Sequence, residues 1–184
     1  MKEGIRIAAF ASGPVNSSGS TCLFCVVCRK GVIEGMLSSR IKIDGNDATS
    51  KIVLMLARSR FSRQVGMIAL NGVALAGLNI VDTQHLERKL GIPVIVITRK
   101  KPDRKSMLDA IEKRFAGDEN LFGRKKAALE TSSETGFRKS NGFYFSCSAA
   151  QSDIARMVPY AAGALRIAHM AARACSTGES KGRI

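Results

Sequence analysis

Apolar positions in the first 43 residues recur with the period of two that β-strands require. Residues 5–10 predict a buried strand, and residues 22–29 (CLFCVVCR) and 35–43 predict two more. The segments that join them, at 11–21 and 30–34, are short and contain glycine. Short connections of this kind favour antiparallel neighbours. The pattern therefore predicts a three-strand antiparallel meander.

After residue 46 the apolar spacing changes, and helices are expected to alternate with short strands. The expected helices are 48–59, 82–90, 106–115, 120–130 and 159–175, and the expected strands are 67–70, 93–98 and 142–147. Asp47 and Ser106 are candidate N-caps, and Pro159 suits the first turn of the last helix. A meander followed by α-β-α-β is the order of a ribonuclease H-like α/β domain, a mixed central sheet flanked by helices. Another three-layer sandwich could begin in the same way.

The composition indicates one folded domain over residues 1–184, with a more variable polar segment at 117–142 that ends in a mobile loop. Of the 184 residues 45% are apolar, which is enough for a hydrophobic core. The longest apolar stretch, 65–81, is shorter than the roughly 20 residues that a membrane helix needs. Arg6 interrupts the N-terminal apolar run too early for a secretory signal. We therefore expect a cytoplasmic protein without a membrane partner.

Three of the five cysteines, Cys22, Cys25 and Cys28, have a spacing compatible with zinc or iron–sulfur ligation. In a strand, however, Cys22 and Cys28 face one side and Cys25 faces the other. The sequence therefore favours small buried side chains that form no disulfides, and a metal-cluster protein is the less favoured alternative.

The charge balance is strongly basic, with 29 Lys and Arg against 15 Asp and Glu and a net charge of +14. A domain this basic usually binds a polyanion such as nucleic acid, although a solvated basic surface gives the same count. Phe61 is a candidate stacking or wedge residue, although most phenylalanines belong to the core. The candidate phosphate contacts are Arg60, Arg63, Arg99, Lys100 and Arg166, the last on a helical stripe with His169.

Two carboxylates, Asp44 and Asp82, follow apolar segments, and Gly45 would let the chain turn after the first. Acids gathered at strand ends can hold Mg²⁺ for phosphodiester hydrolysis. The alternative is structural, with Asp44 shaping a turn and Asp82 capping a helix. Spacing alone leaves both interpretations open. The sequence has no Gly-x-Ser-x-Gly elbow, Walker loop or dinucleotide fingerprint.

Longer motifs carry a family resemblance. They are IDGNDATSKI at 43–52, SRF at 59–61, LNGVALAGLNIVD at 70–82, GIPVIV at 91–96, LRIAH at 165–169 and GESKGR at 178–183. These runs resemble the endonuclease dU family, which is largely archaeal and similar to endonuclease V, and the match is weak at 117–158. The resemblance implies a ribonuclease H-like fold and Mg²⁺- or Mn²⁺-dependent cleavage of DNA with deaminated bases, deoxyuridine being the suggested lesion.

The resemblance also implies roles for individual residues. Asp44 and Asp82 would be metal ligands, Asp47 a third, His169 would assist catalysis, and Asn71 would contact DNA. The family usually carries an Asp pair at the end of its first strand, where this chain has Ala11 and Ser12. Losing a carboxylate that ligates the metal should lower activity by orders of magnitude. The expected function is a metal-dependent DNA-repair endonuclease, impaired by the loss of the Asp pair, and the alternative is a catalytically inactive nucleic-acid-binding protein of the same fold.

Overall fold

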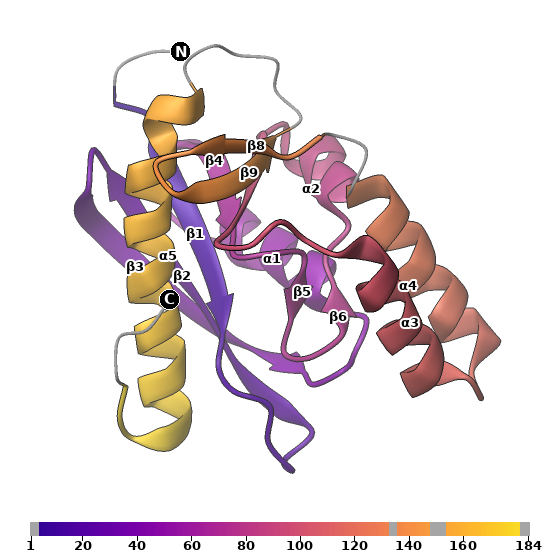
Figure 1. Ribbon diagram of the computed structural model, residues 1–184. Coiled ribbons are helices and arrows are strands. Elements are labelled where there is room, and N and C mark those ends of the chain that lie inside the picture. Colours follow the sequence, from indigo (N-terminus) through magenta and orange to yellow (C-terminus); the bar gives the residue numbers. More distant parts are fainter. Residues whose placement is uncertain (1–3, 133–135, 148–153, 181–184) are drawn as a thin grey trace.

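A seven-stranded mixed sheet forms the centre of the protein, with strand order β3-β2-β1-β4-β7-β9-β8 (Figure 1). The computed structural model describes residues 4–132, 136–147 and 154–180. The strands are β1 (Arg6–Ser12), β2 (Ser20–Arg29), β3 (Val32–Lys42), β4 (Val65–Leu70), β7 (Val94–Thr98), β8 (Arg138–Ser140) and β9 (Phe143–Cys147), and a separate hairpin pairs β5 (Ala74–Leu75) with β6 (Asn79–Ile80). β1, β2 and β3 form an antiparallel meander, whereas β1, β4 and β7 run parallel.

Helices cover both faces of the sheet. They are α1 (Ala48–Ala57), α2 (Thr83–Leu90), α3 (Arg104–Phe115), α4 (Glu119–Ser132) and α5 (Ile154–Thr177). Alternation along β1 sends Ala8 and Phe10 into the core beneath α1–α4, and Ile7, Ala9 and Ala11 into the core beneath α5. The expected mixed sheet, meander and flanking helices are confirmed.

Some local predictions are wrong. The side chain of Asp103, one turn before the predicted cap, accepts a hydrogen bond from Ser106 N and caps α3. Pro159 lies inside α5 rather than in its first turn, because buried Ile154 and Val158 extend the apolar stripe upstream. Strand β8 and the β5–β6 hairpin were not predicted. The loop expected after α4 includes residues 133–135, which lie outside the described residues.

No helix in the described ranges combines the length and the apolar character needed to cross a bilayer.

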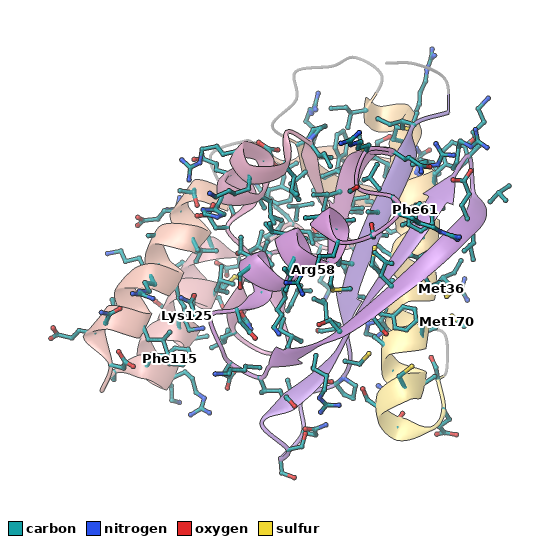
Figure 2. All side chains as sticks on the ribbon, turned by 180° about the vertical axis from the view of Figure 1, so that it is seen from behind. Met36, Arg58, Phe61, Phe115, Lys125 and Met170 are labelled. Carbon is teal, nitrogen blue, oxygen red and sulfur yellow. The ribbon has the colours of Figure 1, made fainter. Side chains whose placement is uncertain are left out.

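Phe61 contributes to the core beneath α1–α4 and is 6% exposed, so its ring is not available for stacking on a base (Figure 2). Its ring lies against Gly35 of β3, where an added Cβ would come within 2.5 Å of Cζ. The missing side chain at residue 35 thus makes room for this ring, and Arg60 lies 4.8 Å above the ring centroid.

We expect Gly35→Ala to lower the free energy of unfolding by about 1–3 kcal/mol, since the Phe61 ring must move out of a packed site. Gly123→Ala is the control, because it lies in α4 with nothing within 4 Å of an added Cβ. It should raise stability by about 0.5–1 kcal/mol. Urea unfolding of both variants measures the difference, and equal effects would contradict the packing described here.

Candidate nucleic-acid interface

The parallel strands β1, β4 and β7 end at the same edge of the sheet, called here the carboxyl edge. Ser12 ends β1, Asn71 follows β4 and Arg99 follows β7. Asn71 and Arg99 are exposed. Ligands of open α/β sheets bind outside the carboxyl ends of the strands, so this edge is the natural place for a site.

Strand β1 brings a methyl group and a hydroxyl to the carboxyl edge, and no carboxylate. Ala11 is 3% exposed and packs in the core beneath α5. The Ser12 hydroxyl oxygen accepts a hydrogen bond of 2.8 Å from the backbone N–H of Ala76 in the turn of the β5–β6 hairpin. The family resemblance led us to expect aspartates at positions 11 and 12. Only residue 12 faces the hairpin, because residue 11 points into the core beneath α5.

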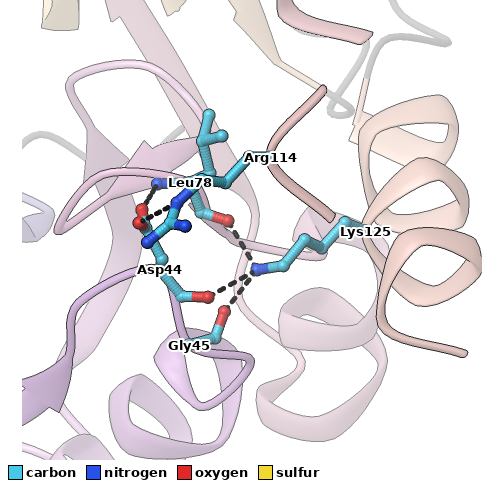
Figure 3. A network of polar contacts seen from close by, with 5 residues as sticks. All are labelled: Asp44, Gly45, Leu78, Arg114 and Lys125. Atoms are coloured by element: carbon cyan, nitrogen blue, oxygen red, sulfur yellow. Dashed lines mark hydrogen bonds and ion pairs between the residues drawn. The ribbon is translucent and has the colours of Figure 1, made fainter. Parts of the chain in front are cut away.

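Asp44 lies on the other side of the same hairpin turn. Its φ of 54° is in the left-handed region, and its N–H donates to Ala76 O at 2.9 Å. One carboxylate oxygen accepts from Leu78 N–H at 2.9 Å, and the other from Arg114 Nε at 3.0 Å (Figure 3). Ser12 and Asp44 are thus held close together through Ala76.

The carboxylate of Asp44 is charged and already paired. Burial alone would raise the pKa of Asp44, but the Leu78 N–H, the Arg114 guanidinium and the Lys125 ammonium outweigh burial and lower it. A metal ion at this carboxylate would have to compete with Arg114 for the same oxygen.

Lys125 of α4 is completely buried and holds the Asp44 loop in place. Its Nζ donates to the carbonyl oxygens of Asp44 (3.1 Å), Gly45 (2.5 Å) and Leu78 (2.6 Å) (Figure 3). The ammonium also lies 4.5 Å from the centroid of the Phe115 ring, beside it in Figure 2. Burial lowers the pKa of Lys125 to about 8, although the nearby acids Asp44 and Asp47 favour the charged form.

Asp47 and Asn79 close the segment between β3 and α1. Asn79 is completely buried. Its Nδ2 donates to Asp47 Oδ1 (2.7 Å) and Lys42 O (2.9 Å), while its Oδ1 accepts from Ala48 N–H (3.1 Å). Asp47 occupies the N-cap position of α1 but makes no side-chain cap hydrogen bond, because the Asn79 amide takes that role.

Asp82 caps α2. Its side chain accepts from His85 N–H at 2.8 Å and contacts the Thr131 hydroxyl at 3.4 Å. Its own N–H donates to Thr49 Oγ1 at 3.0 Å. The structure therefore agrees with the capping interpretation of this residue.

The donor set does not fit a magnesium site built from several carboxylates. Asp44, Asp47 and Asp82 bind separate partners, and no group of three or more His, Cys, Asp or Glu within the described ranges could hold a metal ion. Hard divalent cations need several oxygen ligands around one point. We therefore derive no reaction step through a metal.

The remaining candidate residues divide among three places. Arg99 and Lys100 follow β7 at the carboxyl edge, near Asn71. Arg60 and Arg63 are exposed in the segment that precedes β4, which puts them at the opposite edge. Arg166, exposed, and His169, half-buried, lie on α5, across the sheet from Asp44 and Asp82. The structure thus does not bring His169 or the Arg60 segment to the acids.

A cavity of about 410 Å³ opens at the carboxyl ends of β4 and β7, and sequence reasoning missed it. Its lining includes the apolar residues Val73, Val96, Met107, Leu129 and Phe137, the basic residues Lys100, Lys101 and Arg104, and the acidic Asp103. The three basic residues are exposed. Small-molecule pockets have volumes of about 300–1,000 Å³ and combine apolar walls with a few polar groups. This cavity suits an apolar group whose negative charge lies beside the exposed Lys100 and Lys101.

Solved structures show which fold class this is. A crystal structure of an Archaeoglobus fulgidus protein is 28% identical and has a TM-score of 0.81, covering 96% of this chain and 100% of that one. Human ENDOV has a TM-score of 0.53 at 12% identity, covering 92% of this chain and 83% of that one. The chain therefore shares the fold of endonuclease V.

Sequence comparison then shows the family. The family model described as Endonuclease dU matches residues 3–176, so the chain belongs to the endonuclease dU family, as its motifs indicated. A UPF0215 protein of Thermococcus kodakarensis is 34% identical over 191 residues, covering 98% of this chain and 97% of that protein. A UPF0215 protein of A. fulgidus is also 34% identical, over 86% of this chain and 87% of that protein.

We expect Lys125→Met to lower the free energy of unfolding by about 1–3 kcal/mol, since it leaves buried carbonyls without a donor. The exposed Lys126→Met is the matched control, with an expected change within about 0.5 kcal/mol. Chemical denaturation at pH 7 measures both, and equal effects would contradict the anchoring role.

The pH dependence gives a second readout of the same variant. Because the folded-state pKa of Lys125 is below its ordinary value, the unfolded chain binds more protons between about pH 8 and 10.5. The stability of the native chain should therefore rise across this interval relative to that of Lys125→Met.

Proposed function

We propose that this protein binds nucleic acid at the carboxyl edge, with DNA that contains a deaminated base, such as deoxyuridine, as its ligand. The observation that carries the proposal is the cavity at the ends of β4 and β7, where apolar walls and exposed basic side chains meet. The ribonuclease H-like nuclease fold that we infer from family membership and from the likeness to human ENDOV supports it.

The chemistry of the cavity matches an extruded nucleotide. Proteins that act on a single base take it out of the stack and hold it between apolar side chains, as Val73, Met107 and Leu129 could do here. The exposed Lys100 and Lys101 would neutralise the flanking phosphates. A net charge of +14 favours the approach of a polyanion to the whole domain.

We infer that the chain binds without efficient metal-dependent cleavage. β1 ends in Ala11 and Ser12, and the Asp44 carboxylate is paired with Arg114. Ala11 and Ser12 carry no negative charge, and Arg114 occupies the charge of Asp44. A divalent cation needs such negative charge. The alternative is the family's Mg²⁺- or Mn²⁺-dependent endonuclease reaction, and the closeness of Ser12 and Asp44 favours it as the second candidate.

We expect Lys100→Ala/Lys101→Ala to weaken binding to labelled DNA with one deoxyuridine. The plot of log affinity against log salt should become shallower by nearly one unit per lost phosphate contact. Fluorescence anisotropy over a salt series measures this, with EDTA present throughout.

The matched control is Arg60→Ala/Arg63→Ala, which removes the same charge from the opposite edge. It should change affinity little. If both double variants lose affinity equally, the charge acts nonspecifically and the carboxyl edge is not the binding site.

A nicking assay separates the two functions. With Mg²⁺ or Mn²⁺, the native chain should bind deoxyuridine or deoxyinosine DNA without nicking it. Ser12→Asp should gain divalent-cation binding, seen by calorimetry, and metal-dependent nicking, because it places a second carboxylate beside Asp44.

Ala11→Asp is the control for that substitution. Its carboxylate would enter the apolar core beneath α5, so it should destabilise the protein and restore no nicking. Metal-dependent nicking by the native chain, abolished by EDTA, would overturn the binding-only proposal in favour of the endonuclease.

A further inference from the structure

Cys22 of β2 and Cys175 of α5 meet where the end of the last helix crosses the sheet. Alternation along β2 directs Cys22 to the α5 face, the same face as Val26 and Cys28. Cys175 lies in the last turn of α5, three residues after the buried Ala172, and is itself exposed. The alternation of β2 and the position of Cys175 near the end of α5 therefore place the two thiols on the same face of the sheet.

The contacts around the pair agree with this geometry. The thiol of Cys175 is near enough to that of Cys22 to raise the pKa of Cys22. Thr21, which precedes Cys22, and Ser176, which follows Cys175, also touch, with 3.4 Å between Thr21 Oγ1 and Ser176 Oγ. On the other side, Gly13 N–H donates to Cys22 O at 2.8 Å, which ties the pair to the end of β1.

The thiols of Cys22 and Cys175 are more accessible to solvent than those of the other three cysteines. Cys175 is exposed and Cys22 half-buried, whereas Cys25, Cys28 and Cys147 are buried. Burial raises the pKa of the Cys22 thiol, and Cys175 raises it further. Cys175 is therefore the thiol that meets an oxidant first, and Cys22 is positioned to react second.

We propose that Cys22 and Cys175 are a redox pair that forms a reversible disulfide when the protein meets a low-molecular-weight disulfide. The Cys175 thiolate attacks one sulfur of the small disulfide, forms a mixed disulfide and releases one small thiolate. Cys22, as its thiolate, then attacks the Cys175 sulfur and releases the second. The two protein thiols are oxidised, the small disulfide is reduced to two thiols, and the two protons pass to the released thiolates.

The bond would link β2 to the last turn of α5, two residues from the end of that helix. It would close a loop of about 150 residues, and cross-links over long loops constrain the unfolded chain most. Because Cys22 pairs with Gly13, the linked segment lies next to Ser12 at the carboxyl edge.

Oxidised glutathione is the probe that tests the proposal on the full chain. After treatment we expect two thiols per chain to be lost, and non-reducing peptide mapping to find one cross-linked peptide pair that contains Cys22 and Cys175. The midpoint of denaturant unfolding should move to higher denaturant, and dithiothreitol should reverse both changes.

Cys22→Ser and Cys175→Ser are the controls. Cys22→Ser should retain a glutathione adduct at Cys175, and neither variant should show the shifted unfolding midpoint. A native chain that holds glutathione at Cys175 while Cys22 stays reduced would overturn the proposal. Cross-links between chains through Cys175 in place of the internal bond would overturn it as well.

Discussion

The buried ammonium of Lys125 constrains the part of the structure that lies between the sheet and helices α3 and α4. A charged group in the interior is costly unless its hydrogen-bonding capacity is filled. Here the three donors of Nζ meet three backbone carbonyls, and the Phe115 ring lies beside them. Those carbonyls come from the Asp44 loop and from the β6 side of the small hairpin. One side chain thus links the Asp44 loop to the small hairpin, which the hydrogen bond from Asp44 N–H to Ala76 O also joins.

The family motifs can be understood from this arrangement. The run at 43–52 supplies Asp44 and Asp47, and the run at 70–82 supplies Asn79 and Asp82. Their side chains bind backbone N–H groups, an arginine and one another, so that each run holds the other in place. Residues whose types suggest metal chemistry in the sequence therefore stabilise loops in this chain. This is the structural interpretation that the sequence left open for Asp44 and Asp82.

The spacing of apolar residues predicted the longer strands and helices, because neighbouring residues determine that spacing. The meander, the strands β4 and β7 and helix α2 were expected because their apolar spacing lies within a few residues, and the Asp82 cap was one of two interpretations. The β5–β6 hairpin was missed because each strand has two residues, and contacts with Ser12 and Asp44 hold it. Lys125 was missed because a lysine in a polar segment is ordinarily exposed. The cavity was missed because its walls come from segments about 60 residues apart.

The charge at the carboxyl edge bears on the choice between binding and cleavage. Carboxylates at a nuclease site repel the phosphate they serve, and a bound cation normally offsets that repulsion. In this chain Ser12 is uncharged, and the carboxylate of Asp44 close to it already has Arg114 and Lys125 as cationic neighbours. The exposed Lys100 and Lys101 add positive charge at the adjoining cavity, whose lining also includes Asp103 and an Arg104 that is paired with Glu130. Under the proposed function a phosphate would approach this edge without a divalent ion to bridge it, which is why we expect affinity to persist in EDTA.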